Sequence, residues 1–200
     1  MPTASDQVIG IYQRQAKAWV QFRNTDLIEK DWLQKFLKLM PNGNSILDLG
    51  CGFGDPIGRF LIEKGYRLTG VDTSPELIEI AQQEFPNDTW LVSDMRSLKL
   101  DRQFDGIIAW NSFFHLPHND QRHMFEVFKQ HARPNAPLMF TTGPSFGEAF
   151  GQFEGEELYH ASLDASEYQS LLMGHGFKVI DHIVEDETCG NLTIWLAQFG

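Results

Sequence analysis

Apolar and polar positions follow two alternating patterns along most of the chain. Short, nearly continuous apolar runs, typical of strands buried on both faces, occupy residues 45–50, 66–72, 88–94, 104–110 and 136–143. Between these runs, apolar residues recur every three or four positions, which predicts helices over residues 55–65, 73–85, 119–132 and 164–176. Two last apolar runs, residues 177–187 and 191–199, are separated only by a turn near Gly190.

Alternating strands and helices predict an α/β fold, in which helices cover both faces of a parallel sheet. No helix is expected between the last two strands, so one of them should run antiparallel. Two segments lie outside the alternation. Residues 1–40 have helical periodicity and are expected to form an N-terminal helical cap, and residues 144–164, rich in glycine and aromatic residues, are expected to form a loop. A chain of 200 residues is expected to form a single domain, residues 1–200.

Capping residues mark the starts of two of the predicted helices. Thr73 or Ser74 can cap a helix that has Pro75 at its first position, where a missing backbone N–H costs nothing. Asp164 and Glu167 have the spacing of a capping box. Both helices are therefore expected to begin immediately after these caps.

The charge composition limits the kinds of molecule that the protein is expected to bind. The formal net charge is −11, from 16 Lys and Arg against 27 Asp and Glu, and no stretch is rich in Lys or Arg. Nucleic acids and anionic membrane surfaces attract basic faces, so neither is expected as a partner. The first ten residues lack the basic start and apolar run of a signal peptide, and no apolar stretch is long enough to span a membrane. With only two cysteines, the chain is expected to be cytoplasmic.

A glycine-rich turn follows the first predicted strand, in the stretch ILDLGCGFGDP. Open parallel sheets bind ligands at such turns, where glycine lets the backbone approach the ligand closely. The dinucleotide fingerprint GxGxxG is not matched, because Asp55 stands in the third glycine's place after Gly50 and Gly52. Ile57 stands in that place if the count begins at Gly52 and Gly54. A nicotinamide-dependent oxidoreductase is therefore disfavoured.

Three predicted strands end in an aspartate: Asp48, Asp72 and Asp94. An acidic residue at the position of Asp72 commonly binds ribose hydroxyl groups, and Asp94 can accept a hydrogen bond from an adenine edge. The carboxylate of Asp48, just before the glycine turn, would repel a pyrophosphate and attract an amino group. These positions predict a nucleoside ligand that carries an amino group and no phosphate.

The stretches ILDLGCGFG, VDTS, SDMRSL and FDGIIAWNSFFHL resemble the ordered motifs of class I S-adenosylmethionine-dependent methyltransferases. The chain is most similar to small bacterial methyltransferases of type 11/12, including trans-aconitate methyltransferase-like proteins. The resemblance covers residues 46–143. It implies a Rossmann-like, doubly wound sheet of seven strands, mostly parallel with an antiparallel last strand. It also implies that S-adenosylmethionine is the cofactor, S-adenosylhomocysteine the product, and a small molecule the substrate, methylated on oxygen or nitrogen, a carboxylate included.

The resemblance assigns the methionine part of the cofactor to the glycine turn. Gly50, Cys51 and Gly52 would cradle this part, and Asp48 would lie near its amino group. Trp110, at the end of the fourth predicted strand, would line the sulfonium end.

The resemblance assigns the nucleoside part to the next two strand ends. Asp72 would bind both ribose hydroxyl groups, with Thr73 beside it. Asp94 would bind the adenine amino group, and the backbone of Met95 would contact the ring.

In such enzymes the acceptor is chosen by segments outside the core, here residues 1–40 and the expected substrate-side loop 144–164. Tyr12 and Arg23 are expected to close over the methionine end, with a surface salt bridge from Arg23 to Asp26 as the alternative. Tyr12 and Trp19 are seven residues apart and share a helix face. Trp19 and Phe22 are expected to pack as core residues.

Histidines are the candidate bases. His115 follows the fourth predicted strand, where the acceptor is expected, and His160 either contacts substrate or makes structural hydrogen bonds. A hydroxyl or amine acceptor needs a base, whereas a carboxylate does not. A metal site of His115 and His118 is disfavoured, because no third ligand is near and Pro117 argues against a shared helix face.

Two alternatives to a small-molecule methyltransferase remain: a protein methyltransferase, and a non-catalytic protein that binds S-adenosylmethionine. An RNA methyltransferase is disfavoured by the net charge. The apolar terminal strands are compatible with a monomer or a homodimer.

Overall fold

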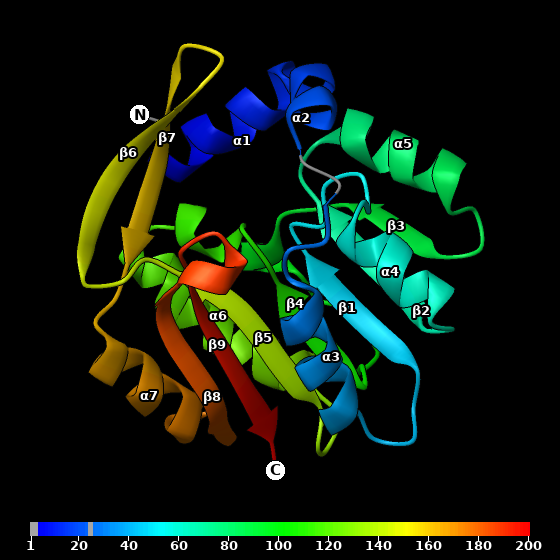
Figure 1. Ribbon diagram of the computed structural model, residues 1–200, viewed down its shortest axis with the longest axis vertical. Coiled ribbons are helices and arrows are strands. Elements are labelled where there is room, and N and C mark those ends of the chain that lie inside the picture. Colours follow the sequence, from blue (N-terminus) through cyan, green and yellow to red (C-terminus); the bar gives the residue numbers. More distant parts are fainter. Residues whose placement is uncertain (1–3, 24–25) are drawn as a thin grey trace.

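The computed structural model of the protein describes residues 4–23 and 26–200 (Figure 1). Seven strands form one sheet in the order β3-β2-β1-β4-β5-β9-β8. The strands are β1 Ser45–Leu49, β2 Arg67–Asp72, β3 Thr89–Val92, β4 Gly106–Ala109, β5 Pro137–Thr142, β8 Phe177–Asp186 and β9 Leu192–Phe199. Only β9 is antiparallel to its neighbours, β5 and β8. The predicted fold class is therefore confirmed, with the last strand in sequence as the antiparallel one.

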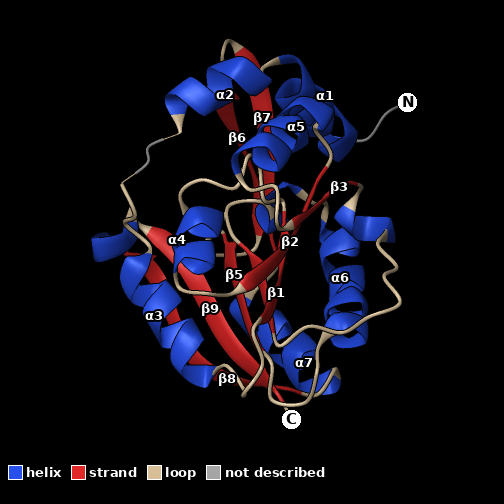
Figure 2. Ribbon diagram, turned by 90° about the vertical axis from the view of Figure 1, so that its right-hand side faces the viewer, coloured by secondary structure: helices blue, strands red, loops and turns tan. Residues whose placement is uncertain are grey.

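Helices cover both faces of the sheet (Figure 2). They are α3 Lys30–Leu39, α4 Ile57–Glu63, α5 Pro75–Glu84, α6 His118–His131 and α7 Ala165–Gly174, with short 3₁₀ turns η1 Met95–Ser97, η2 Phe113–His115 and η3 Glu187–Cys189. Neighbouring strand residues serve opposite faces: Ile46 packs with α3, α4 and α5, whereas Leu47 packs with α6 and α7. This alternation follows from the two-residue period of a strand.

Capping side chains determine where α5 and α7 begin. Ser74, not Thr73, caps α5, because its Oγ accepts a hydrogen bond from the Leu77 N–H at 3.4 Å. Asp164 caps α7 through the Ser166 N–H at 2.9 Å. Glu167 does not complete the expected capping box, because its carboxylate pairs with Arg122 of α6 at 2.6 Å.

No helix of the described residues is long and apolar enough to cross a bilayer.

The segment expected to be a loop forms a β-hairpin instead, made of β6 Gly147–Phe153 and β7 Glu156–Ser162. Glu154 and Gly155 both have positive φ, which lets two residues reverse the chain. The inner face of the β6–β7 hairpin is apolar: Phe153 and Leu158 pack with residues of the first helix. Tertiary packing thus stabilises strands in a segment whose glycines argue against them.

The N-terminal segment divides into two parts. Helices α1 Ala4–Arg14 and α2 Ala16–Phe22 lie above the carboxyl ends of the strands, with α1 beside the β6–β7 hairpin (Figure 1). Arg14 of α1 forms an ion pair with Glu156 of β7. Helix α3 packs on a sheet face through Trp32, Leu33 and Phe36, so it is not part of the expected cap. Residues 1–3 and 24–25 of that segment lie outside the described residues.

Substitution of Gly70 tests the packing of β2 against β3. A Cβ atom at Gly70 would lie 2.3 Å from Cε3 of Trp90 and 2.8 Å from Sγ of Cys51. We expect Gly70→Ala to lower the free energy of unfolding by about 1–3 kcal/mol, as overpacked cores do, measured by urea denaturation. Gly174→Ala, in α7 with no atom within 4 Å of the added Cβ, is the control and should be neutral or slightly stabilising. Equal loss in both variants would contradict this account.

Candidate active site

The glycine turn after β1 requires glycine at two positions. Gly50 and Gly52 have φ of 76° and 56°, a backbone conformation in which residues other than glycine are strained. A Cβ atom at Gly50 would lie 2.2 Å from Cβ of Ser112, so the turn also packs closely against the loop after β4. The N–H groups of Gly50 and Cys51 both donate to the Val71 carbonyl, at 2.7 and 3.1 Å. The turn is therefore fixed to β2 at the point where the strand order reverses, between β1 and β4.

Two adjoining pockets surround this turn. The main pocket has an empty volume of about 690 Å³, open solvent at its entrance included. Eight predicted residues line it: Tyr12, Gly50, Gly52, Asp72, Thr73, Asp94, Met95 and His115. The second, here called the turn pocket, shares Gly50 and Gly52 with the first and adds Arg23, Asp48, Cys51 and Trp110. Of the predicted site residues, only His160 lies outside these two pockets.

Asp48 is a buried acid in the turn pocket. Its side chain is 4% exposed, and it accepts no hydrogen bond from the described residues. Burial raises its pKa to about 7, and the nearby carboxylate of Asp72 adds to this rise. A carboxylate in such a place needs a cationic partner to stay ionised. The turn pocket is therefore built for a positively charged group.

Asp72, at the end of β2, is held by two backbone groups. Its Oδ2 accepts from the Gly52 N–H and its Oδ1 from the Ser74 N–H, both at 2.9 Å. Burial raises the pKa of Asp72, and these hydrogen bonds oppose that rise. Each carboxylate oxygen has a further lone pair for a ligand, so Asp72 can accept from two neighbouring hydroxyl groups. The carbonyl of Thr73, next in the chain, accepts from Gln13 of α1 at 2.8 Å.

Asp94 lines the main pocket, but its carboxylate also pairs with Arg96, a residue that the sequence analysis did not identify. The Arg96 Nη2 lies 2.6 Å from Asp94 Oδ2, and its Nε also donates to that carboxylate. The same guanidinium reaches Asp6 of α1 at 3.0 Å and Asp120 of α6 at 3.2 Å. Arg96 therefore ties α1 to the rim of the pocket. Its position two residues after Asp94 was the available sequence signal.

Tyr12 and His115 form a hydrogen bond across the main pocket, at 3.2 Å between Oη and Nε2. The His115 Nδ1 lies 2.9 Å from the Tyr159 carbonyl, which can only accept. Nδ1 must therefore carry the proton, and Nε2 must accept from Tyr12. Burial lowers the pKa of His115 to about 4, so the ring is neutral near pH 7. His115 lines the pocket as expected, but both of its nitrogens are already engaged.

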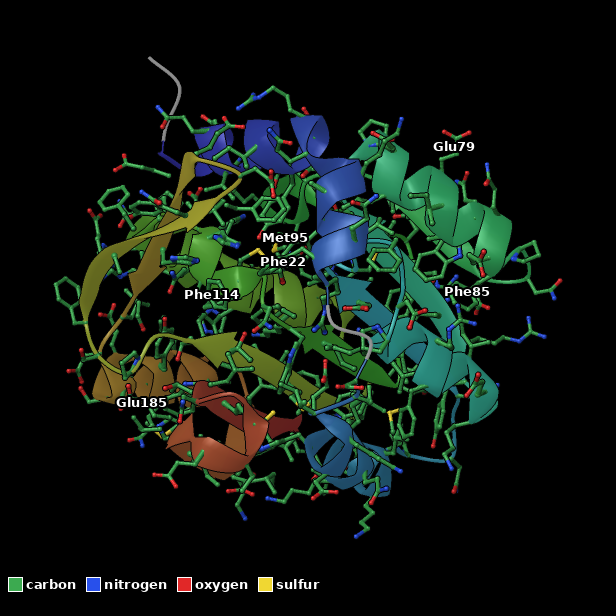
Figure 3. The ribbon with its side chains drawn as sticks, turned by 45° about the horizontal axis from the view of Figure 1, so that its top comes forward. Phe22, Glu79, Phe85, Met95, Phe114 and Glu185 are labelled. Carbon is green, nitrogen blue, oxygen red and sulfur yellow. The ribbon has the colours of Figure 1, made fainter. Side chains whose placement is uncertain are left out.

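Aromatic side chains cover the two pockets. The Tyr12 and Trp19 rings meet edge to face at 5.2 Å between centroids, and Trp19 lines both pockets rather than serving as core alone. Phe22 is 69% exposed, so the expectation that it packs as a core residue is wrong, although its ring lies 5.5 Å from that of Phe153. Figure 3 shows Phe22, Met95 and Phe114 between the β6–β7 hairpin and α5.

Arg23 pairs with Glu29, a partner that the sequence analysis did not identify. The Nη2 to Oε1 distance is 2.8 Å, and Glu29 is fully buried. The Glu29 Oε2 has no partner among the described residues. Glu29 immediately precedes α3. Its ion pair with Arg23 therefore links the turn pocket to the helix that packs on the sheet.

A third pocket, here called the hairpin pocket, lies under the β6–β7 hairpin and contains His160. Its empty volume is about 770 Å³. The His160 ring stacks on that of His115 at 4.8 Å between centroids. His118 stacks on Phe146 at 4.8 Å and bonds the Gly147 carbonyl. Among the described residues, no three His, Cys, Asp or Glu side chains are grouped to hold a metal ion.

Comparisons with known proteins agree with this arrangement. Residues 46–135 match the family described as "Methyltransferase domain". A protein named YqeM from Bacillus subtilis (strain 168) is 34% identical over 121 residues, which are 58% of this chain and 49% of that protein. O-methyltransferase rstn1 of Aspergillus nomiae is 28% identical over 162 residues, 74% of this chain and 70% of that protein. The chain thus spans about half the length of the first of these relatives.

A solved structure shares the fold. Magnesium protoporphyrin IX methyltransferase from Synechocystis PCC 6803, determined with bound S-adenosylmethionine, superposes with a TM-score of 0.73 at 16% identity, covering 100% of this chain and 99% of that one. The strand order, the glycine turn and the family match agree with one another. Residues 46–135 of this chain thus match a methyltransferase-domain family, and the chain shares its fold with an enzyme determined with bound S-adenosylmethionine.

Proposed function

We propose that this protein is an enzyme that transfers the methyl group of S-adenosylmethionine to a small-molecule acceptor and releases S-adenosylhomocysteine. The observation that carries the proposal is Asp48, a buried carboxylate without a hydrogen-bond donor among the described residues, beside the glycine turn. A cation bound beside a buried carboxyl of this kind stabilises its ionised form. The ammonium group of the cofactor's methionine part is such a cation.

The residues around Asp48 fit the rest of the methionine part. Arg23 lines the same pocket and would bind its carboxylate, since guanidinium and carboxylate groups pair through two hydrogen bonds. The backbone of Gly50, Cys51 and Gly52 forms the adjacent wall, and Trp110 closes it from β4.

The main pocket fits the nucleoside part. Asp72 would accept from both ribose hydroxyl groups, because its oxygens are already oriented by backbone N–H groups. Met95 and Leu116 supply apolar walls for an adenine ring. Asp94, although paired with Arg96, keeps acceptor capacity for the adenine amino group.

S-adenosylmethionine, when bound, supplies an electrophilic methyl group: the acceptor's lone pair forms the new bond to carbon as the carbon–sulfur bond breaks and leaves its electron pair on a neutral sulfur. The protein's contribution is to hold both reactants close together, which supplies much of the rate acceleration. The Tyr12 and Trp19 rings line the pocket and attract a positively charged sulfur. His160, whose ring nitrogens are not committed to Tyr12, is the proposed proton acceptor, with His115 holding its ring in place.

The hairpin pocket distinguishes between the alternatives. A non-catalytic protein that binds S-adenosylmethionine needs no second pocket, whereas a methyltransferase needs one for the acceptor. The hairpin pocket is next to the main pocket across the two stacked histidines, which supports a place for an acceptor beside the cofactor site.

Binding of S-adenosylhomocysteine tests the proposal directly. The protein should bind it in a calorimetric titration. Asp72→Ala should weaken binding about 10- to 100-fold, because hydrogen bonds to a charged group are lost. Asp101→Ala, an exposed aspartate on a loop, is the control and should bind like the unaltered protein. Failure of the unaltered protein to bind, or equal affinity in Asp72→Ala, would overturn the assignment.

Asp48 should lower the stability of the fold at neutral pH and contribute to ligand binding. Its raised pKa means that ionised Asp48 destabilises the fold, an effect absent below the unfolded pKa near 3.8 and complete above about pH 7. Asp48→Asn should therefore gain stability relative to the unaltered protein as pH rises, by up to about 3 kcal/mol between pH 5 and pH 7. The same variant should lose S-adenosylhomocysteine binding. Thermal unfolding across this range measures the first effect, and a pH-independent difference would contradict it.

Of the cofactor's groups, Arg23 should act on the amino-acid end alone; because Arg23 also pairs with the buried Glu29, binding is compared at a temperature where thermal unfolding shows the variant to be folded. Arg23→Gln should weaken S-adenosylhomocysteine about tenfold, because one charge-assisted pairing is lost. It should leave 5′-methylthioadenosine, which lacks the ammonium and carboxylate groups, unchanged. Lys17→Gln, on the exposed side of α2, is the matched charge control. If both ligands weakened equally in Arg23→Gln, the substitution would be disturbing the fold rather than a ligand contact.

A further inference from the structure

The hairpin pocket has an unusual charge balance. It is lined by Phe114, Thr142, Gly143, Pro144, Ser145, Phe146, Gly147, Glu148, Ala149, His160, Ala161 and Ser162. Its titratable lining side chains are His160 and the acid Glu148, and no described Lys or Arg lines it. A carboxylate or phosphate acceptor would meet a like charge here and no guanidinium or ammonium group.

Glu148 is held in place at the pocket wall. Its Oε1 accepts from the Tyr159 hydroxyl at 2.7 Å, which leaves Oε2 for another donor. His118 stands beside it, with Nδ1 3.9 Å from Oε1. The side chain of Glu148 is half exposed, so an attraction between it and a bound cation is moderate. It nonetheless sets the sign of charge that the pocket prefers.

Two phenylalanines belong to the remaining walls, Phe114 and Phe146. The Phe114 ring contacts that of His160, tilted, at 5.0 Å between centroids. Phe146, 58% exposed, stacks on His118. An aromatic lining of this kind favours an apolar body, and ring faces also attract a cation.

His160 separates the hairpin pocket from the main pocket. Its ring stacks on His115, which lines the main pocket, and no described residue lines both pockets. A Cβ atom at Gly151 would lie 2.9 Å from Cε1 of His160, so the glycine leaves room for this ring. A group bound in the hairpin pocket beside His160 therefore lies one imidazole ring away from His115 and the main pocket.

Protonation of these histidines agrees with an acceptor that must lose a proton. Burial lowers the pKa of both His115 and His160, so both rings are neutral near pH 7. Methylation of an ammonium or phenol adds a methyl group to nitrogen or oxygen and removes one proton. A neutral imidazole nitrogen of His160 can accept that proton. A carboxylate acceptor would leave this base without a role.

We propose that the hairpin pocket binds the methyl acceptor, and that this acceptor is an amine or phenol carried on an aromatic ring rather than a carboxylate. The proposal rests on the methyltransferase function proposed above. It assigns Glu148 to charge selection and His160 to proton removal.

A ring-matched set of probes tests the acceptor class. Phenethylamine, tyramine and 3-phenylpropionate are titrated calorimetrically into the protein loaded with S-adenosylhomocysteine, and then offered with S-adenosylmethionine in a methyl-transfer assay. We expect the two amines to bind at least tenfold more tightly than 3-phenylpropionate. Glu148→Gln should reduce that ratio severalfold, whereas Glu157→Gln, an exposed acid on β7, should not.

A second variant separates binding from proton removal. His160→Phe keeps a ring against His115 and removes the proton acceptor, so amine binding should persist while methyl transfer falls at least tenfold. Equal or tighter binding of 3-phenylpropionate, binding of no probe, or an amine preference unchanged in Glu148→Gln would overturn the proposal. Loss of S-adenosylhomocysteine binding by the unaltered protein would instead overturn the proposed function, so the two failures are distinguishable.

Discussion

The rest of this site depends on two buried carboxylates at the ends of neighbouring strands. Burial raises the pKa of both Asp48 and Asp72, and the charge of Asp72 raises that of Asp48 further. Asp72 is compensated by backbone N–H groups from the glycine turn and from the start of α5. Asp48 accepts no such hydrogen bond from the described residues, so its pKa rises to about 7 and its charged form is favoured only beside a cation. The positive φ of Gly50 and Gly52 belongs to the same turn, which brings the Gly52 N–H onto Asp72 and the Gly50 N–H onto the Val71 carbonyl.

The sequence predicted the parts of this arrangement that depend on neighbouring residues. Apolar runs ending in an aspartate located β1 and β2 together with their carboxylates, because strand and ligand group are adjacent in the chain. The partners of Arg96 could not be predicted in this way, since Asp6 lies 90 positions away and meets it only after α1 has packed. Glu29 looks like an ordinary surface acid in the sequence, and only the packing of α3 buries it.

The hairpin was missed for a related reason. Its outer strand has glycines and exposed side chains in place of a clean alternation, and its inner face becomes apolar only against α1. Pattern analysis also took His115 for a free group, whereas the fold brings Tyr12 and a backbone carbonyl to its two nitrogens. Contacts between distant segments, rather than local preference, decide which histidine remains chemically available.

The β6–β7 hairpin shares no strand pairing with the seven-stranded sheet among the described residues. It is joined to β5 at one end and to α7 at the other, and the methyltransferase-domain match at residues 46–135 does not reach it. Lengthening, shortening or replacing it would shift no register in the sheet that carries Asp48 and Asp72. A hairpin exchanged in this way would leave the strand pairing around Asp48 and Asp72 in place, but it would have to supply again the backbone carbonyl that orients His115 and the apolar contacts to α1.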